Sequence, residues 1–104
     1  MVRLRGDFDI LGLEPFRIEI ERARAMAEAA VVVDLRGLEF IDSSGLRAVL
    51  DGHSTLAARG LDVTFLRPPE RLWRVFSVTG ADRLLPFDDV HAAAVDAASA
   101  ARDA

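Results

Sequence analysis

Two adjacent hydroxyl groups, those of Ser43 and Ser44, stand where an apolar run gives way to a helical pattern, within Phe40-Ile41-Asp42-Ser43-Ser44-Gly45-Leu46. A serine at such a turn can cap the helix, accept a phosphate or, beside a base, act as a nucleophile. Asp42 and both serines are preferred N-cap residues, so one of them should accept a hydrogen bond from the unpaired first-turn amides. The segment is therefore either a capped helix start or a regulatory switch.

The elements on either side of this segment can be predicted from their patterns. Residues 30–35 form a β-branched run that is apolar except for Asp34, typical of a strand in a parallel sheet that is covered on both faces. Downstream, apolar residues recur at helical spacing, and the predicted helix spans 44–59 and ends at Gly60 in a left-handed cap. Its buried side should hold Leu46, Val49, Leu50, His53 and Ala57.

The chain before this unit predicts one more strand and one more helix. Residues 2–5 alternate apolar and charged side chains, which indicates a short strand, and Gly6 and Asp7 should end it. A helix is expected from Glu14, since Pro15 is tolerated in a first turn. Its buried stripe should comprise Phe16, Ile20, Ala23, Ala27 and Ala30. Arg36 and Gly37 should form a turn after the apolar strand.

The chain after this unit predicts a strand over 61–66, a helix over 69–78 that ends at Gly80, and a short edge strand at 84–86. An Ala-rich helix is expected over 89–102. Since a strand, a crossover helix and a second strand form a right-handed unit in nearly all proteins, we predict an α/β fold. The expected architecture is a single domain, residues 1–104, with a mixed sheet of about four strands and helices packed mainly on one side.

The sequence argues against an enzyme. A hydrolase nucleophile elbow needs glycine on both sides of the serine, whereas this segment has only Gly45 on one side. A base must also lie within hydrogen-bonding reach, and His53 falls ~14 Å along the helix from Ser43. His91 begins the final predicted helix and is expected at the surface. Because the sequence has no Gly-rich phosphate loop, metal-ligand spacing or dinucleotide fingerprint, we expect no catalytic residue, metal or cofactor.

The composition limits the possible partners. The net charge is −4 with acidic and basic residues interspersed, so we expect binding neither to nucleic acid nor to an anionic membrane. There is no cysteine, and no apolar run approaches the length of a membrane span or of a signal-peptide core. Trp73 is expected to pack at a helix edge rather than to act as a stacking platform. These features together predict a cytoplasmic protein.

Carboxylates are expected near the serines. The carboxyl ends of parallel strands gather at one edge of a sheet, where ligands and partners usually bind. Asp9 follows the first strand and Asp42 follows the second, so the two side chains are expected to flank Ser43. Asp9 either forms a turn or helps to orient the hydroxyl and to complement a partner's cation, and both interpretations stay open.

Three blocks of the sequence resemble the STAS domain, the fold of bacterial anti-sigma factor antagonists. Residues 38–47 resemble its Asp-Ser signature, residues 4–9 its Gly-Glu-Leu-Asp block, and residues 69–80 its Arg-Leu-x-x-Phe-x-x-x-Gly helix. The likeness covers roughly residues 4 to 90. Asp7 stands where the family usually has glutamate, and Arg47 stands where the best-known antagonists have a smaller residue.

The resemblance implies a function by partner switching. The residue directly after the aspartate, here Ser43, is the expected phosphoacceptor, Ser44 is a cap or neighbour, and Asp9 occupies the position of an acidic residue near that serine. An unphosphorylated antagonist of this family binds an anti-sigma factor with kinase activity, and phosphorylation ends the association. A separate phosphatase resets it. The alternatives are a non-switching STAS module of a transporter or stress-sensing scaffold, and a binder of small anions at the helix start.

Two interaction surfaces are predicted. One docks on the kinase partner and comprises Ser43 with Asp9, Asp42, Ser44, Gly45, Leu46, Arg47 and Asp51. The other is the edge beside the first strand, because the family usually has an additional strand there and this chain has little room for one. An uncovered edge recruits strands, so another chain or the C-terminal segment should cover it. If a second copy of the chain covers it, the protein forms a homodimer.

Overall fold

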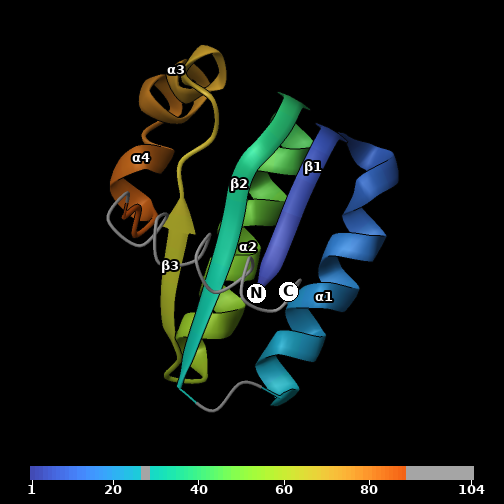
Figure 1. Ribbon diagram of the computed structural model, residues 1–104, viewed down its shortest axis with the longest axis vertical. Helices are drawn as coiled ribbons and strands as arrows, with labels where there is room; N and C mark the ends of the chain where they lie inside the picture. The colour runs from blue at the N-terminus through green and yellow to red at the C-terminus, as the bar shows by residue number, and fades with distance from the viewer. Residues whose placement is uncertain (27–28, 89–104) are drawn as a thin grey trace, which may run out of the picture.

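Three parallel strands form the sheet at the centre of the fold, in the order β1-β2-β3 (Figure 1). The structure, a computed structural model, describes residues 1–26 and 29–88. In chain order the elements are β1 (Val2–Phe8), the 3₁₀ turn η1 (Ile10–Gly12), α1 (Leu13–Met26), β2 (Ala30–Ile41), α2 (Ser43–Ala58), β3 (Asp62–Leu66), α3 (Glu70–Thr79) and α4 (Ala81–Leu84).

The helices α1 and α2 pack against each other and against the same face of the sheet, whereas α3 and α4 lie on the β3 side (Figure 1). Each of the two crossovers advances by one strand in the same direction across the sheet. Right-handed crossovers that advance in the same direction place their helices on the same face. The prediction that helices pack mainly on one side is explained by this repeated step.

The sheet differs from the predicted mixed sheet of about four strands. Within the described residues all strand pairs are parallel and there are three strands. The short strand predicted at 84–86 does not form. Instead α4 ends at Leu84, and Phe87 forms a single parallel bridge with Phe65. The N–H of Phe65 donates to the carbonyl of Pro86 over 2.9 Å. Pro86 has no N–H to continue a ladder, which restricts the pairing. The Ala-rich helix predicted over 89–102 lies outside the described residues.

The strand β2 is longer than predicted. No turn forms at Arg36 and Gly37; the strand continues to Ile41, and β1 likewise continues past Gly6 and Asp7 to Phe8. The pairing absorbs the extra residues as two irregularities in register, one between Arg3 and Arg5 and one between Gly6 and Asp7. A Cβ on Gly37 would lie 3.0 Å from Cγ of Arg5, so glycine here permits close strand contact rather than a turn.

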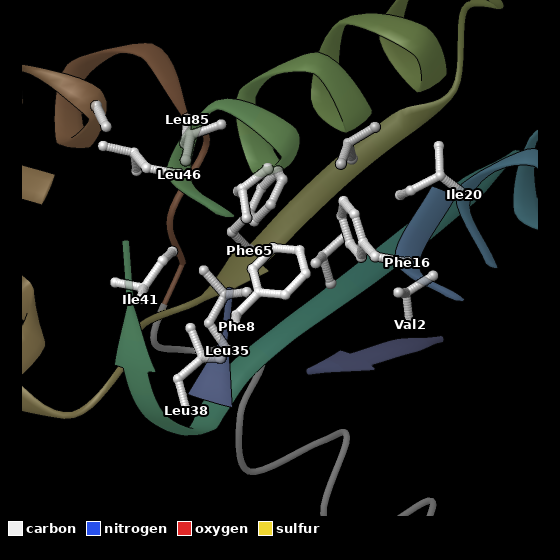
Figure 2. Packing of buried hydrophobic residues seen from close by; sticks show 14 of the residues in the cluster. Val2, Phe8, Phe16, Ile20, Leu35, Leu38, Ile41, Leu46, Phe65 and Leu85 are labelled. Carbon is white, nitrogen blue, oxygen red and sulfur yellow. The ribbon is translucent and has the colours of Figure 1, made fainter. Parts of the chain in front are cut away.

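The core lies between the sheet and the two helices α1 and α2 (Figure 2). Of the stripe predicted on α1, Phe16 and Ile20 are buried and Ala23 is half-buried, whereas Ala30 belongs to β2 and Ala27 lies outside the described residues. The fully buried strand residues include Val33, Leu35 and Phe65. The predicted helix ends are confirmed, with left-handed φ values of 85° at Gly60 and 82° at Gly80.

The strand β1 forms one edge of the described sheet. A groove of about 220 Å³ runs between this strand and α1, and its lining includes Leu4, Phe8 and Phe16. Coverage of this edge by another chain, and the homodimer that would follow, stay predictions.

Candidate functional site

The carboxyl ends of β1 and β2 meet at one edge of the sheet, and the candidate site is built there (Figure 1). Phe8, the last residue of β1, pairs with Ile41, the last residue of β2. The backbone N–H of Asp42 donates to the carbonyl of Phe8 over 3.4 Å. The turn η1 follows β1 and the helix α2 follows β2, so the first residues of both elements lie at this edge.

Asp42 caps α2. Its backbone is extended (φ −101°, ψ −177°), and its Oδ1 accepts a hydrogen bond from the N–H of Gly45 over 2.8 Å. The N–H of Leu46 donates to the carbonyl of Asp42 over 2.9 Å, which closes the first helical turn. Among the three cap candidates in the sequence, the structure therefore selects the aspartate.

Ser43 and Ser44 are the first two residues of the helix, and both are exposed. Neither hydroxyl forms a hydrogen bond with any residue in the described ranges. Because Asp42 performs the capping, the helix start does not need the serine hydroxyls. Their exposure leaves them accessible to a modifying enzyme.

Gly45 and Leu46 lie beneath this surface. A Cβ on Gly45 would overlap the carbonyl oxygen of Phe8 and would lie 3.1 Å from Cγ1 of Ile41, so glycine allows α2 to start against the end of β1. Leu46 is 7% exposed and its side chain lies within the core (Figure 2). Both were expected in the docking surface. Gly45 and Leu46 are instead buried, and their packing fixes the position of the helix start that carries Ser43 and Ser44.

Arg47 and Asp51 lie on the exposed face of α2, one turn apart. Arg47 Nε and Asp51 Oδ2 are 4.0 Å apart, and the two side chains are 84% and 73% exposed. An ion pair with this exposure contributes little to stability. Both side chains are exposed, and their contact with a partner stays a prediction.

Asp9 caps the turn η1. Its Oδ1 accepts a hydrogen bond from the N–H of Leu11 over 3.1 Å, and its carbonyl accepts one from Gly12 over 3.0 Å. The turn-forming interpretation of Asp9 is confirmed. Its predicted influence on the Ser43 hydroxyl stays a prediction, since no hydrogen bond joins the two side chains within the described residues.

Two further residues at this edge were not predicted from the sequence. Ile10 and Leu11 follow Asp9 in η1, and they are 70% and 84% exposed. The available signal was the apolar stretch 10–13 directly after Asp9, because apolar residues at the carboxyl end of a strand, where partners usually bind, are candidates for contact.

A buried carboxylate, that of Asp34, lies in the middle of β2, and this residue is 7% exposed. Its Oδ1 accepts hydrogen bonds from the N–H and Nε of Arg36, both over 3.0 Å, and its Oδ2 lies 3.7 Å from Nε of Arg3. Burial raises the pKa of Asp34, but the hydrogen bonds from Arg36 and the charges of both arginines outweigh it. The pKa therefore lies below the ordinary value of 3.8.

One of the two histidines contacts the core. The imidazole of His53 packs edge-on against the ring of Phe65, with centroids 5.9 Å apart, so it faces the core. His91 lies outside the described residues. In residues 1–26 and 29–88 no group of three potential metal ligands gathers. The helices of the same ranges are all too short or too polar to cross a membrane.

Comparison with known proteins matches residues 1–86 of this chain to the family described as "Mlab, STAS domain". The chain belongs to the STAS domain family. The anti-sigma F factor antagonist of Paenibacillus polymyxa is similar to this STAS domain, with 27% identity over 92 residues, which cover 86% of this chain and 77% of that protein.

A solved structure supports the same family and fold. The anti-sigma factor antagonist SpoIIAA in its unphosphorylated form matches this STAS domain with a TM-score of 0.66 and 28% identity. The match covers 83% of this chain and 76% of that one. The predicted family and the α/β class are confirmed, and the number and direction of the strands are corrected as described above.

Proposed function

We propose that this STAS domain is an anti-sigma factor antagonist that works by partner switching, with Ser43 as the phosphoacceptor. The observation that carries the proposal is the division of roles at the start of α2. Asp42 caps the helix, whereas the exposed Ser43 hydroxyl has no structural role within the described residues. The similarity to two anti-sigma factor antagonists supports the same function.

The chain would be the substrate of the kinase and not itself an enzyme. ATP belongs to the anti-sigma factor partner. The Ser43 oxygen attacks the γ-phosphorus, the bond between that phosphorus and ADP breaks, and the hydroxyl proton passes to a base on the partner. A separate phosphatase hydrolyses the phosphoserine and restores binding. Because the kinase needs ATP, we place the switch in the cytoplasm.

The fold should tolerate the phosphate. Phosphorylation adds about −1.5 to −2 charges at Ser43, the first residue of α2. The first-turn amides and the helix dipole favour an anion at this end of a helix. The modified protein should therefore stay folded, so the switch acts on binding and not on stability.

The partner should not tolerate the phosphate. Binding would remove water from Ser43 and from the neighbouring Asp42, and an added dianion must then be desolvated near a like charge. A penalty of only about 2.7 kcal/mol lowers affinity roughly a hundredfold. A modest local cost is thus enough to separate the two proteins.

Calorimetric titration into the cognate anti-sigma factor tests the proposal. Ser43→Ala should bind as the unmodified protein does and should resist phosphorylation, whereas Ser43→Asp should bind about a hundredfold more weakly. Ser54→Ala, at an exposed serine further along α2 and outside the predicted docking surface, is the matched control, and it should bind and become phosphorylated normally. Equal affinities for the unmodified protein, Ser43→Ala and Ser43→Asp would contradict switching and favour a non-switching STAS module.

A further inference from the structure

The turn η1 presents two consecutive apolar side chains to solvent. Leu11 has the largest exposed fraction of the large hydrophobic residues in the described ranges, 84%, and its neighbour Ile10 is 70% exposed. Single exposed apolar side chains are common on protein surfaces and need no explanation. Two adjacent ones are more informative here, because the same edge of the sheet carries the exposed Ser43.

This turn is held in place from below. Asp9 caps it through the N–H of Leu11, and a Cβ on Gly12 would lie 3.1 Å from Cδ1 of the Phe8 ring. Phe8 itself is only 2% exposed. The apolar pair is therefore displayed on a supported turn, and little conformational entropy would be lost when a partner covers it.

The apolar pair lies beside the phosphoacceptor. Phe8 contacts the start of α2 twice, through the hydrogen bond from the N–H of Asp42 to its carbonyl and through the close approach of Gly45. The turn η1 that follows Phe8 contacts α2 as well. A protein that covers Ser43 would thus meet the apolar pair in the same interface.

The charges at this edge restrict what can cover it. Neither Asp9 nor Asp42 forms an ion pair with a cation in the described residues. An anionic bilayer would be repelled by these carboxylates, and a second copy placed face to face would bring four of them together. A different protein with an apolar pocket and without acidic groups around it meets neither penalty.

We propose that Ile10 and Leu11 form the apolar anchor by which this STAS domain binds its anti-sigma factor, seated in an apolar pocket of that partner next to Ser43. The inference rests on the proposed function and adds a reason for the switch. An apolar anchor excludes water from its surroundings, and a neutral hydroxyl loses little hydration there, whereas a phosphate loses much.

Titration of Ile10→Ser, Leu11→Ser and the double variant into the anti-sigma factor tests the anchor. Burying an exposed leucine or isoleucine should be worth about tenfold in affinity for each side chain and about a hundredfold for both. The matched control is Val78→Ser on α3, where the side chain is 74% exposed, and it should bind within twofold of the unmodified protein. Circular dichroism should be unchanged in all variants because the side chains are already exposed.

The outcomes separate the anchor from the function. If Ser43→Asp loses binding while the double variant binds normally, the anchor is overturned and the proposed function stands. If the unmodified protein does not bind the anti-sigma factor at all, both fail. Binding of the unmodified protein to phosphatidylglycerol vesicles, or self-association that Leu11→Ser abolishes, would also overturn the anchor by assigning the pair to another occupant.

Discussion

Two carboxylates, one within β2 and one directly after it, serve different purposes. Asp34, in the middle of β2, is buried and is neutralised by Arg36 and Arg3. Asp42, directly after β2, caps α2 through the N–H of Gly45 and forms no ion pair within the described residues. The buried charge of Asp34 is thus paired with arginines, whereas the charge of Asp42 caps a helix. Asp34 and Asp42 therefore stabilise the fold, and Ser43 stays exposed beside them without a stabilising hydrogen bond in the described residues.

Disrupting the packing beneath the start of α2 should give the largest loss of stability. In Gly45→Val the added side chain would overlap the carbonyl oxygen of Phe8, so α2 could not start against β1. We expect a loss of about 3 kcal/mol in the free energy of unfolding. Urea denaturation measures it, with Ser44→Val as the matched control that should change stability by less than about 0.5 kcal/mol. Equal effects of both substitutions would show that the close approach is not a constraint.

The next largest effect on stability should come from removing the charge of Asp34, and this effect should depend on pH. Asp34→Asn removes the charge that Arg36 binds, and we expect a loss of about 1–2 kcal/mol at pH 7. The pKa of Asp34 is lower in the folded protein than in the unfolded chain, so its contribution is full above the unfolded pKa and is lost as the pH falls through the folded pKa.

The difference in unfolding free energy between the unmodified protein and Asp34→Asn should therefore shrink as the pH falls from about 4, the ordinary pKa of an aspartate, toward the lower pKa of the folded protein. Urea denaturation at several pH values checks this, and Asp51→Asn, an exposed carboxylate on α2, is the control. A difference that stays constant over this pH range would show that the arginines do not stabilise the ionised form.

Removal of the helix cap should have a smaller effect on stability. Asp42→Ala leaves the N–H of Gly45 without its acceptor and should cost about 1 kcal/mol. Asp42→Ser should retain most of the stability because a serine hydroxyl can accept the same hydrogen bond. Thermal melting of the two variants checks the prediction. If Asp42→Ala were as stable as the unmodified protein, one of the serines must have taken over the cap.

The smallest expected effect on stability is that of Ser43→Asp, within about 0.5 kcal/mol of the unmodified protein. The hydroxyl makes no hydrogen bond within the described residues, and an anion is favoured at the start of a helix. Chemical denaturation is the measurement. A loss of more than 1 kcal/mol would mean that Ser43 is structural, and a weaker affinity of Ser43→Asp could then not be assigned to switching.

The sequence by itself predicted the elements that local patterns control. The change from a β-branched run to a helical period located the start of α2 within one residue, and Gly60 and Gly80 marked helix ends because only glycine adopts a left-handed φ without strain. Local order also placed Asp42 and Ser43 between strand and helix. The STAS family followed from three short blocks, and the match over residues 1–86 confirmed it.

The tertiary structure decided what depends on residues distant in the chain. Three consecutive residues were competent to cap α2, and the contact between Asp42 and Phe8 fixed which one does so. Gly37 permits strand pairing instead of a turn because Arg5 lies against it, and Gly45 is buried because β1 ends beneath it. The exposure of Leu11 beside Ser43 likewise arises only when the carboxyl ends of β1 and β2 are brought together. Such pairings are set by packing across the sheet, which no local pattern encodes.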